Sequence, residues 1–243
     1  MNIILAIKSL NVLGGGAERV LVDVAEGLFR RGHAVRVMTF DFPGESFYDL
    51  SPDIERCDLA FNLAGHSIPR LKMLWALPKM RAAITRGEPD VIVAFMHSTY
   101  VPVAIAALGL GVPLVVSEHT EARHYHNRPL QRGVRQLVDR YAALRTVPSE
   151  SVRAGYDRLF DRPAVVVQNP VNLQLFEACS ALTPDESPVI LSVGRLMIEK
   201  DHAVLLDAFA YLADSFPEWR LRIVGEGPLR ADLERQAIRL GIS

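Results

Sequence analysis

The sequence has few cysteines, no secretion signal and no long uninterrupted apolar run. Cys57 and Cys179 lie far apart and match no metal-ligand spacing, which indicates reduced, structural thiols in a cytosolic compartment. Residues 1–8 lack the basic start and the small-residue cleavage site of a signal peptide. The longest uncharged stretch, residues 98–117, is interrupted by two prolines and two glycines, which argues against a membrane span. We therefore expect a cytoplasmic protein without a transmembrane segment.

The sequence also lacks a surplus of charge. It carries 27 Lys and Arg against 28 Asp and Glu, a formal net charge of −1, so no global positive field would recruit nucleic acid. With 49% hydrophobic and 23% charged residues, the composition is that of an ordinary globular protein. Its 243 residues leave room for one large domain or two smaller ones.

Short β-branched runs alternate with longer helical patterns, which predicts an α/β fold with a doubly wound parallel sheet. Strands are expected at 3–7, 34–40, 54–59, 91–95, 114–117, 144–147, 164–167, 189–193 and 220–224. Helices are expected at 17–31, 69–86, 100–108, 130–143, 149–159, 201–215 and 229–240. A proline-rich, aperiodic stretch predicts an N-terminal domain at 1–170, a linker at 171–188 and the first part of a second domain at 189–243. Such sheets normally have about five to six strands, so we expect the second domain to be incomplete.

Two cations follow the strand expected at 189–193. Gly194 comes directly after this strand, Arg195 offers a planar fork for phosphate oxygens, and Lys200 adds a mobile charge before the next helix. Since ligands of open α/β sheets bind beyond the carboxyl ends of strands, this loop predicts a diphosphate site. A solvated surface loop is the alternative, and the spacing alone leaves both open.

A glycine-rich turn follows the first expected strand. Gly14-Gly15-Gly16 lets the backbone approach a phosphate or a sugar hydroxyl, although a tight turn that needs glycine is the alternative. Glu18 either hydrogen-bonds within this site or complements the helix dipole. The spacing is not a dinucleotide fingerprint, and only Asp41 follows strand two where a ribose would bind. A nicotinamide-dependent oxidoreductase is therefore disfavoured.

Five short motifs occur in a fixed order along the chain. They are Gly15-Gly16-Ala17-Glu18-Arg19, Ser117-Glu118-His119, Asn169-Pro170-Val171, Gly194-Arg195 with Lys200, and Gly225-Glu226-Gly227-Pro228. Together they resemble the retaining glycosyltransferases of the GT-B fold, group 1 (family four), and most of all bacterial enzymes that extend lipid-linked oligosaccharides and exopolysaccharide repeat units. The resemblance covers the whole chain and implies two Rossmann-like domains. It also implies a hexosyltransferase that moves a sugar from a nucleotide diphosphate sugar to an acceptor hydroxyl with retention, without a metal or other cofactor.

The resemblance assigns roles to individual residues. His119 is expected beside the reacting sugar, while Arg195 and Lys200 stabilise charge on the departing diphosphate, so these three are the predicted catalytic residues. The predicted substrate-binding residues are Gly15, Gly16, Glu18, Ser117, Asn169, Gly194, Gly225, Glu226 and Gly227. The resemblance implies that Glu226 accepts hydrogen bonds from the base or ribose, with a solvated turn carboxylate as the alternative.

Two further expectations concern what the chain lacks relative to this family. A metal cluster of His119, His124 and His126 is disfavoured, because no cysteine or carboxylate lies at ligand spacing. The family's Glu-x7-Glu pair, which holds the donor sugar and ribose, lies further along the second domain than Ser243. The alternative hypothesis is therefore a catalytically inactive chain that only binds an acceptor or a partner.

Two basic stretches stand out against the neutral whole. Residues 70–86 hold five Lys and Arg among apolar residues without an acid, and residues 123–145 hold six arginines opposed only by Asp139. Each stretch suits an anionic membrane surface that presents a lipid-linked acceptor, which implies a peripheral position on the inner face of the plasma membrane. An ordinary solvated helix face is the alternative for each.

Overall fold

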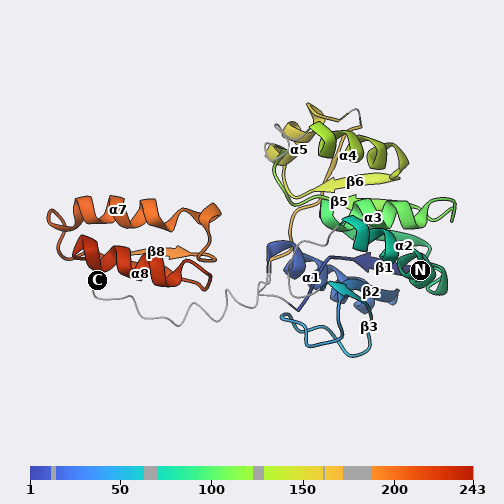
Figure 1. Ribbon diagram of the computed structural model, residues 1–243, viewed down its shortest axis with the longest axis horizontal. Helices are drawn as coiled ribbons and strands as arrows, with labels where there is room; N and C mark the ends of the chain where they lie inside the picture. Colours follow the sequence, from blue (N-terminus) through green and yellow to red (C-terminus); the bar gives the residue numbers. More distant parts are fainter. Residues whose placement is uncertain (12–14, 63–69, 123–128, 161, 172–187, 243) are drawn as a thin grey trace. The chain divides into compact units, whose positions relative to one another are not determined.

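The computed structural model describes residues 1–11, 15–62, 70–122, 129–160, 162–171 and 188–242. The chain divides into two compact units, Met1–Val171 and Asn172–Ser243, which are described separately below (Figure 1). The predicted linker, 171–188, lies outside the described residues except at its two end positions.

Unit 1 is built on a parallel sheet of seven strands in the order β3-β2-β1-β4-β5-β6-β7. The strands are β1 (Asn2–Ala6), β2 (Ala34–Asp41), β3 (Glu55–Asn62), β4 (Val91–Phe95), β5 (Leu114–Ser117), β6 (Leu144–Val147) and β7 (Val165–Val166). All seven strands expected before residue 170 are confirmed. The chain winds outward from β1 in one direction and from β4 in the other, so the topological switch point lies between β1 and β4.

Helices cover both faces of this sheet. They are α1 (Gly16–Arg30), α2 (Arg70–Arg86), α3 (His97–Ala107), α4 (Pro129–Tyr141) and α5 (Glu150–Asp157). Helix α3 begins three residues earlier than expected, so that Pro102 lies inside the helix and not in its first turn. Ser149 caps α5 as expected, since its side chain accepts a hydrogen bond of 3.3 Å from the Val152 amide.

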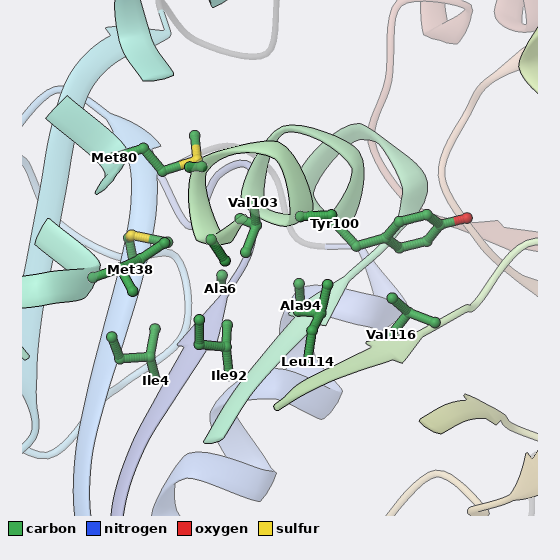
Figure 2. Packing of buried hydrophobic residues seen from close by; sticks show 14 of the residues in the cluster. Ile4, Ala6, Met38, Met80, Ile92, Ala94, Tyr100, Val103, Leu114 and Val116 are labelled. Carbon is green, nitrogen blue, oxygen red and sulfur yellow. The ribbon is translucent and has the colours of Figure 1, made fainter. Parts of the chain in front are cut away.

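Alternation along β1 divides the core between the two faces. Ile3 and Leu5 pack in the cluster that includes α1, whereas Ile4 and Ala6 pack in the cluster formed with α2, α3 and α4. Figure 2 shows the second cluster, in which side chains of α3 lie against strand residues such as Ala94 and Val116. Both faces of the strands are therefore buried, which leaves the strand ends and their loops to form a site.

Unit 2 has two parallel strands, β8 (Val189–Val193) and β9 (Arg220–Val224). A short 3₁₀ turn, η2 (Ile198–Lys200), precedes helix α7 (His202–Ala213), and helix α8 (Arg230–Leu240) follows β9. Leu196, Leu206 and Leu233 form the small buried core between these elements. Within the described residues of both units, no helix is long and apolar enough to cross a membrane.

Candidate functional site

In unit 1 four neighbouring strands end at one edge of the sheet. Because β1, β4, β5 and β6 are parallel and adjacent, the residues that follow them lie along this edge in the same order. The loop after β1 leads to Gly15 and Gly16 at the start of α1, and the loop after β5 carries Ser117 and His119. The fold therefore brings these predicted residues to a common edge, with β4 between them.

His119 is the best-defined predicted residue of this edge. Its ring is half-buried, stacks on Phe95 with a centroid distance of 5.5 Å, and lies 3.0 Å from the Ser117 hydroxyl through Nε2. The other ring nitrogen, Nδ1, has no hydrogen bond to any residue that the structure describes. Burial lowers the pKa of His119, and the neighbouring Glu118 carboxylate offsets part of this effect, so the imidazole is neutral at pH 7.

Glu118 and Arg135 form a buried ion pair beneath this loop, which the sequence analysis missed. The two residues are 1% and 2% exposed, and the Tyr100 hydroxyl donates to Glu118 Oε2 at 2.9 Å. Glu118 Oε1 accepts the amides of His119 and Thr120 at 3.2 and 3.1 Å. The carboxylate therefore holds the backbone that carries the candidate histidine. The sequence did contain a signal that Arg135 is buried, because this residue lies at helical spacing from the apolar positions 138 and 142.

The prediction that 123–145 faces a membrane is wrong for two of its arginines. Arg135 is buried against Glu118, and Arg145 is 7% exposed and paired with the buried Asp139. The Arg145 guanidinium also lies 4.3 Å from the centroid of the Phe160 ring, and burial lowers its pKa to about 10. Each of these buried arginines has a buried carboxylate as its partner, so neither charge is available to a membrane surface. Arg123 and Arg128 lie outside the described residues.

The loop after β1 is held by Asp41. This carboxylate is 1% exposed and accepts the amides of Leu10 and Asn11 at 2.7 and 3.2 Å, with Arg56 at 3.7 Å. A carboxylate buried in this way is not accessible to a ribose. The oxidoreductase alternative therefore loses the acidic residue on which it depended.

The predicted glycine residues differ in their surroundings. A β-carbon on Gly15 would collide with the Glu18 carboxylate, so Glu18 lies against the start of α1, whereas Gly16 has nothing within 4 Å of such an atom. The Tyr48 hydroxyl donates to the Gly15 carbonyl at 3.2 Å. Asn169 is exposed and lies three residues beyond β7, and Gly14 falls outside the described part.

In unit 2 the loops after β8 and β9 pack backbone against backbone. The Gly194 amide donates to the Val224 carbonyl at 3.0 Å, and the Leu196 amide donates to the Glu226 carbonyl at 2.9 Å. A β-carbon on Gly225 would lie 2.9 Å from the Gly194 carbonyl carbon, and one on Gly227 would collide with Leu196. These two glycines are required for close packing of the loops, whatever ligand they also contact.

The cations of this edge are available to a ligand. Arg195 and Lys200 are exposed, and neither side chain has an ion pair or hydrogen bond within the part of the chain that the structure describes. The Glu226 carboxylate, in contrast, is exposed and paired with Arg230 at 2.5 Å. His202, at the start of α7, is buried at 5% exposure, and neither ring nitrogen has a hydrogen-bond partner among the described residues. Within the described residues, this edge thus presents two unpaired positive charges beside tightly packed loop backbone.

Two smaller predictions can be placed in the same way. Cys57 is a free thiol, and burial raises its pKa, which disfavours the thiolate and agrees with a non-nucleophilic role. Within the described residues no group of three His, Cys, Asp or Glu could hold a metal ion. His124, His126 and Cys179 lie outside those residues.

Sequence comparisons identify relatives of both units. The family model of Glycosyltransferase Family 4 matches residues 14–175, and that of Glycosyl transferases group 1 matches residues 178–243. A Campylobacter jejuni α-1,4-N-acetyl-D-galactosaminyltransferase, named for an undecaprenol-diphosphate-linked acceptor, is 31% identical over 100% of this chain and 66% of its own length. The phosphatidyl-myo-inositol mannosyltransferase of Mycobacterium tuberculosis is 26% identical over 93% of this chain and 61% of its own length. The chain therefore spans somewhat less than two thirds of these relatives.

Comparison with solved structures supports the same fold. The Anabaena HepE protein in complex with UDP and glucose has a TM-score of 0.73 at 21% identity, over 100% of this chain and 67% of its own. The sucrose-phosphate synthase of Thermosynechococcus elongatus has a TM-score of 0.74 at 20% identity, over 99% of this chain and 68% of its own. The predicted GT-B class is confirmed by these neighbours. Since the family 4 model alone covers more than half of the residues, the chain belongs to Glycosyltransferase Family 4.

Proposed function

We propose that this chain is the acceptor-side unit and part of the donor-side unit of a glycosyltransferase that acts on a lipid-linked glycan. Its donor is a nucleotide diphosphate sugar, and the product retains the anomeric configuration. The observation that carries the proposal is the pair of cations Arg195 and Lys200, which have no partner among the described residues and lie beside the packed loops of β8 and β9. Charge that develops on a departing diphosphate is stabilised by cations held in place before the reaction.

The proposed roles follow from this arrangement. Arg195 grips the diphosphate oxygens in a bidentate manner and Lys200 adds a point charge, while His119 contacts the reacting sugar. The leaving phosphate helps to take the acceptor proton, so the proposal assigns no protein nucleophile. Support for the donor class comes from the HepE structure with UDP and glucose, and support for the acceptor class comes from the name of the Campylobacter relative.

The test is calorimetric titration of the chain with UDP, GDP and UDP-glucose, followed by a transfer assay on an undecaprenyl-diphosphate-linked glycan. Loss of a charged hydrogen bond costs about 1.5–3 kcal/mol, so Arg195→Ala and Lys200→Ala should each weaken binding by roughly 10- to 150-fold. Arg222→Ala, on β9, is the control and should bind like the unaltered chain. Absence of binding to every nucleotide would refute the donor site. Binding of the acceptor without turnover would leave the alternative, a chain that only binds.

We also propose that the exposed face of α4, and not the buried Arg135 and Arg145, provides the membrane contact. Leu130, Val134 and Leu137 lie on one face of this helix and are 68%, 37% and 66% exposed. Arg132 and Arg140 are exposed on the same helix, so an apolar stripe is accompanied by positive charge, as on helices that lie on anionic membranes.

In the stretch 70–86 two of the positive charges form hydrogen bonds with backbone carbonyls of unit 1. Lys79 donates to the Leu59 carbonyl at 2.6 Å, and Arg81 donates to the carbonyls of Ala106 and Leu108.

A flotation assay with phosphatidylglycerol vesicles tests the α4 contact. Leu137→Gln should reduce vesicle binding, whereas Leu108→Gln, at a position that is 54% exposed after α3, should not. Equal loss in both variants, or no binding at low salt, would refute this contact.

A further inference from the structure

The ring of His119 is part of a chain of three polar side chains from adjacent strands. The Thr146 hydroxyl, on β6, donates to the Ser117 hydroxyl oxygen at 3.1 Å, and Ser117 Oγ lies 3.0 Å from His119 Nε2. A serine hydroxyl has one proton to donate. The only other hydrogen-bond partner of Ser117 Oγ among the described residues is Nε2, so with Thr146 as donor to the oxygen the Ser117 proton is directed to Nε2. Nε2 is then an acceptor, and a neutral imidazole must carry its proton on Nδ1.

Several hydrogen bonds hold the backbone around this ring in place. Glu118 Oε1 accepts the amides of His119 and Thr120, and the Tyr156 hydroxyl donates to the Thr120 carbonyl at 3.0 Å. The Glu118 amide donates to the Thr146 carbonyl at 2.9 Å, and the ring itself stacks on Phe95. With the backbone and the ring plane both held, the contact of Nε2 with Ser117 leaves Nδ1 as the ring nitrogen without a partner among the described residues.

We propose that Ser117 and Thr146 are positioning residues that set the tautomer of His119, so that the neutral ring offers Nδ1–H as a hydrogen-bond donor at the sheet edge. Nδ1 has no hydrogen bond to any described residue, so this donor is available to an oxygen of a sugar or a phosphate. In this state His119 donates a hydrogen bond and does not act as a base. The use of that donor in transfer rests on the proposed function, whereas the tautomer itself does not.

Charged and titratable groups near the ring are consistent with the neutral form. The Glu118 carboxylate is neutralised by Arg135 and receives the Tyr100 hydroxyl. Burial raises the pKa of Tyr100 well above its ordinary value, so this hydroxyl keeps its proton. Among the described residues of β4 and β6, the ring contacts the uncharged Phe95 directly and the uncharged Thr146 through Ser117. At a pH above the lowered pKa of His119 the ring is neutral, and the remaining question is which of its two nitrogens carries the proton.

The experiment is a long-range ¹H–¹⁵N NMR correlation on the ¹⁵N-labelled chain at pH 8, with the His119 signals assigned by their loss in His119→Gln. The unaltered chain should show a protonated Nδ1 and an unprotonated Nε2. Ser117→Ala should move the signals toward the Nε2–H pattern, and Thr146→Val should move them in the same direction, whereas Ser117→Thr, which keeps a hydroxyl, should not. An Nε2–H pattern in the unaltered chain, or an unchanged pattern in Ser117→Ala, would overturn the proposal.

A second arm separates this proposal from the proposed function. UDP-glucose should shift the Nδ1 signal of the unaltered chain, and loss of a neutral hydrogen bond predicts roughly three- to tenfold weaker binding in Ser117→Ala. A chain with the expected tautomer but no response to UDP-glucose would refute the placement of His119 beside the donor sugar and leave the tautomer assignment standing. Circular dichroism of each variant shows whether it is folded, and Ser117→Thr provides the folded comparison.

Discussion

Removal of the Arg135 guanidinium should destabilise unit 1 strongly. In Arg135→Met the Glu118 carboxylate, 1% exposed, stays buried without its cation. Breaking a buried ion pair in this way costs about 3–5 kcal/mol. For a unit of about 170 residues, each kcal/mol corresponds to roughly 2–4 °C in Tm, so the expected decrease in Tm is about 6–20 °C. Thermal and urea unfolding followed by circular dichroism measure this change.

Two comparison variants make this prediction sharp. Adding Glu118→Gln to Arg135→Met removes the stranded charge but keeps an oxygen for the His119 and Thr120 amides, so the double variant should be more stable than Arg135→Met alone. Arg153→Met breaks an exposed pair with Glu150, whose side chains are 44% and 67% exposed, and should cost less than about 1 kcal/mol. If Arg135→Met were no less stable than Arg153→Met, or if the double variant were the least stable, the reasoning would be refuted.

Three further predictions follow from single contacts. Gly225→Ala would place a β-carbon 2.9 Å from the Gly194 carbonyl carbon and should cost about 1–3 kcal/mol in thermal unfolding, while Gly16→Ala, with open space around it, should be tolerated. Asp41→Ala leaves the Leu10 and Asn11 amides without their acceptor, at a cost of about 1–3 kcal/mol, and should speed hydrogen exchange in residues 8–11. His119 should titrate below pH 6.5 by NMR, and lower still in Glu118→Gln, because the carboxylate raises a pKa that burial lowers. Since its folded pKa is below its unfolded pKa, protonation of His119 should reduce the free energy of unfolding as the pH falls below about 6.5; an unchanged titration in Glu118→Gln would contradict the electrostatic account.

Periodicity was sufficient to predict the strands, because the repeat of side-chain direction along an element is set by the local backbone conformation. Alternating and continuous apolar runs predicted every strand of unit 1, including the weak one near residue 54, which the structure has as β3 at Glu55–Asn62. The predicted helix ends were less accurate than the predicted strands. Helix α3 begins at His97 because its first turn is bonded to the Met96 carbonyl, with Met96 itself at a φ of 66°, and no residue pattern indicates such a start.

The position of two predicted residues could be inferred from a short motif, although their roles stay predictions. Ser117 and His119 were placed correctly at a sheet edge, because parallel strands bring their carboxyl ends together once the strand order is known. The basic stretches were harder to interpret, since charge composition does not show which arginines have a buried partner. Arg135 and Arg145 looked like surface charge in the sequence and are core ion pairs in the structure.

The sequence by itself determined the order and type of the elements, the glycine turns and the residues that mark the family, because each of these depends on neighbours within a few positions. The tertiary structure alone decided the partners of the charged groups. Asp41 holds the loop after β1, Glu118 holds the loop of His119, and Arg195 and Lys200 have no partner among the residues that the structure describes. The physical reason is that ion pairing and burial depend on contacts between segments far apart in the chain, and these contacts exist only after the sheet has formed.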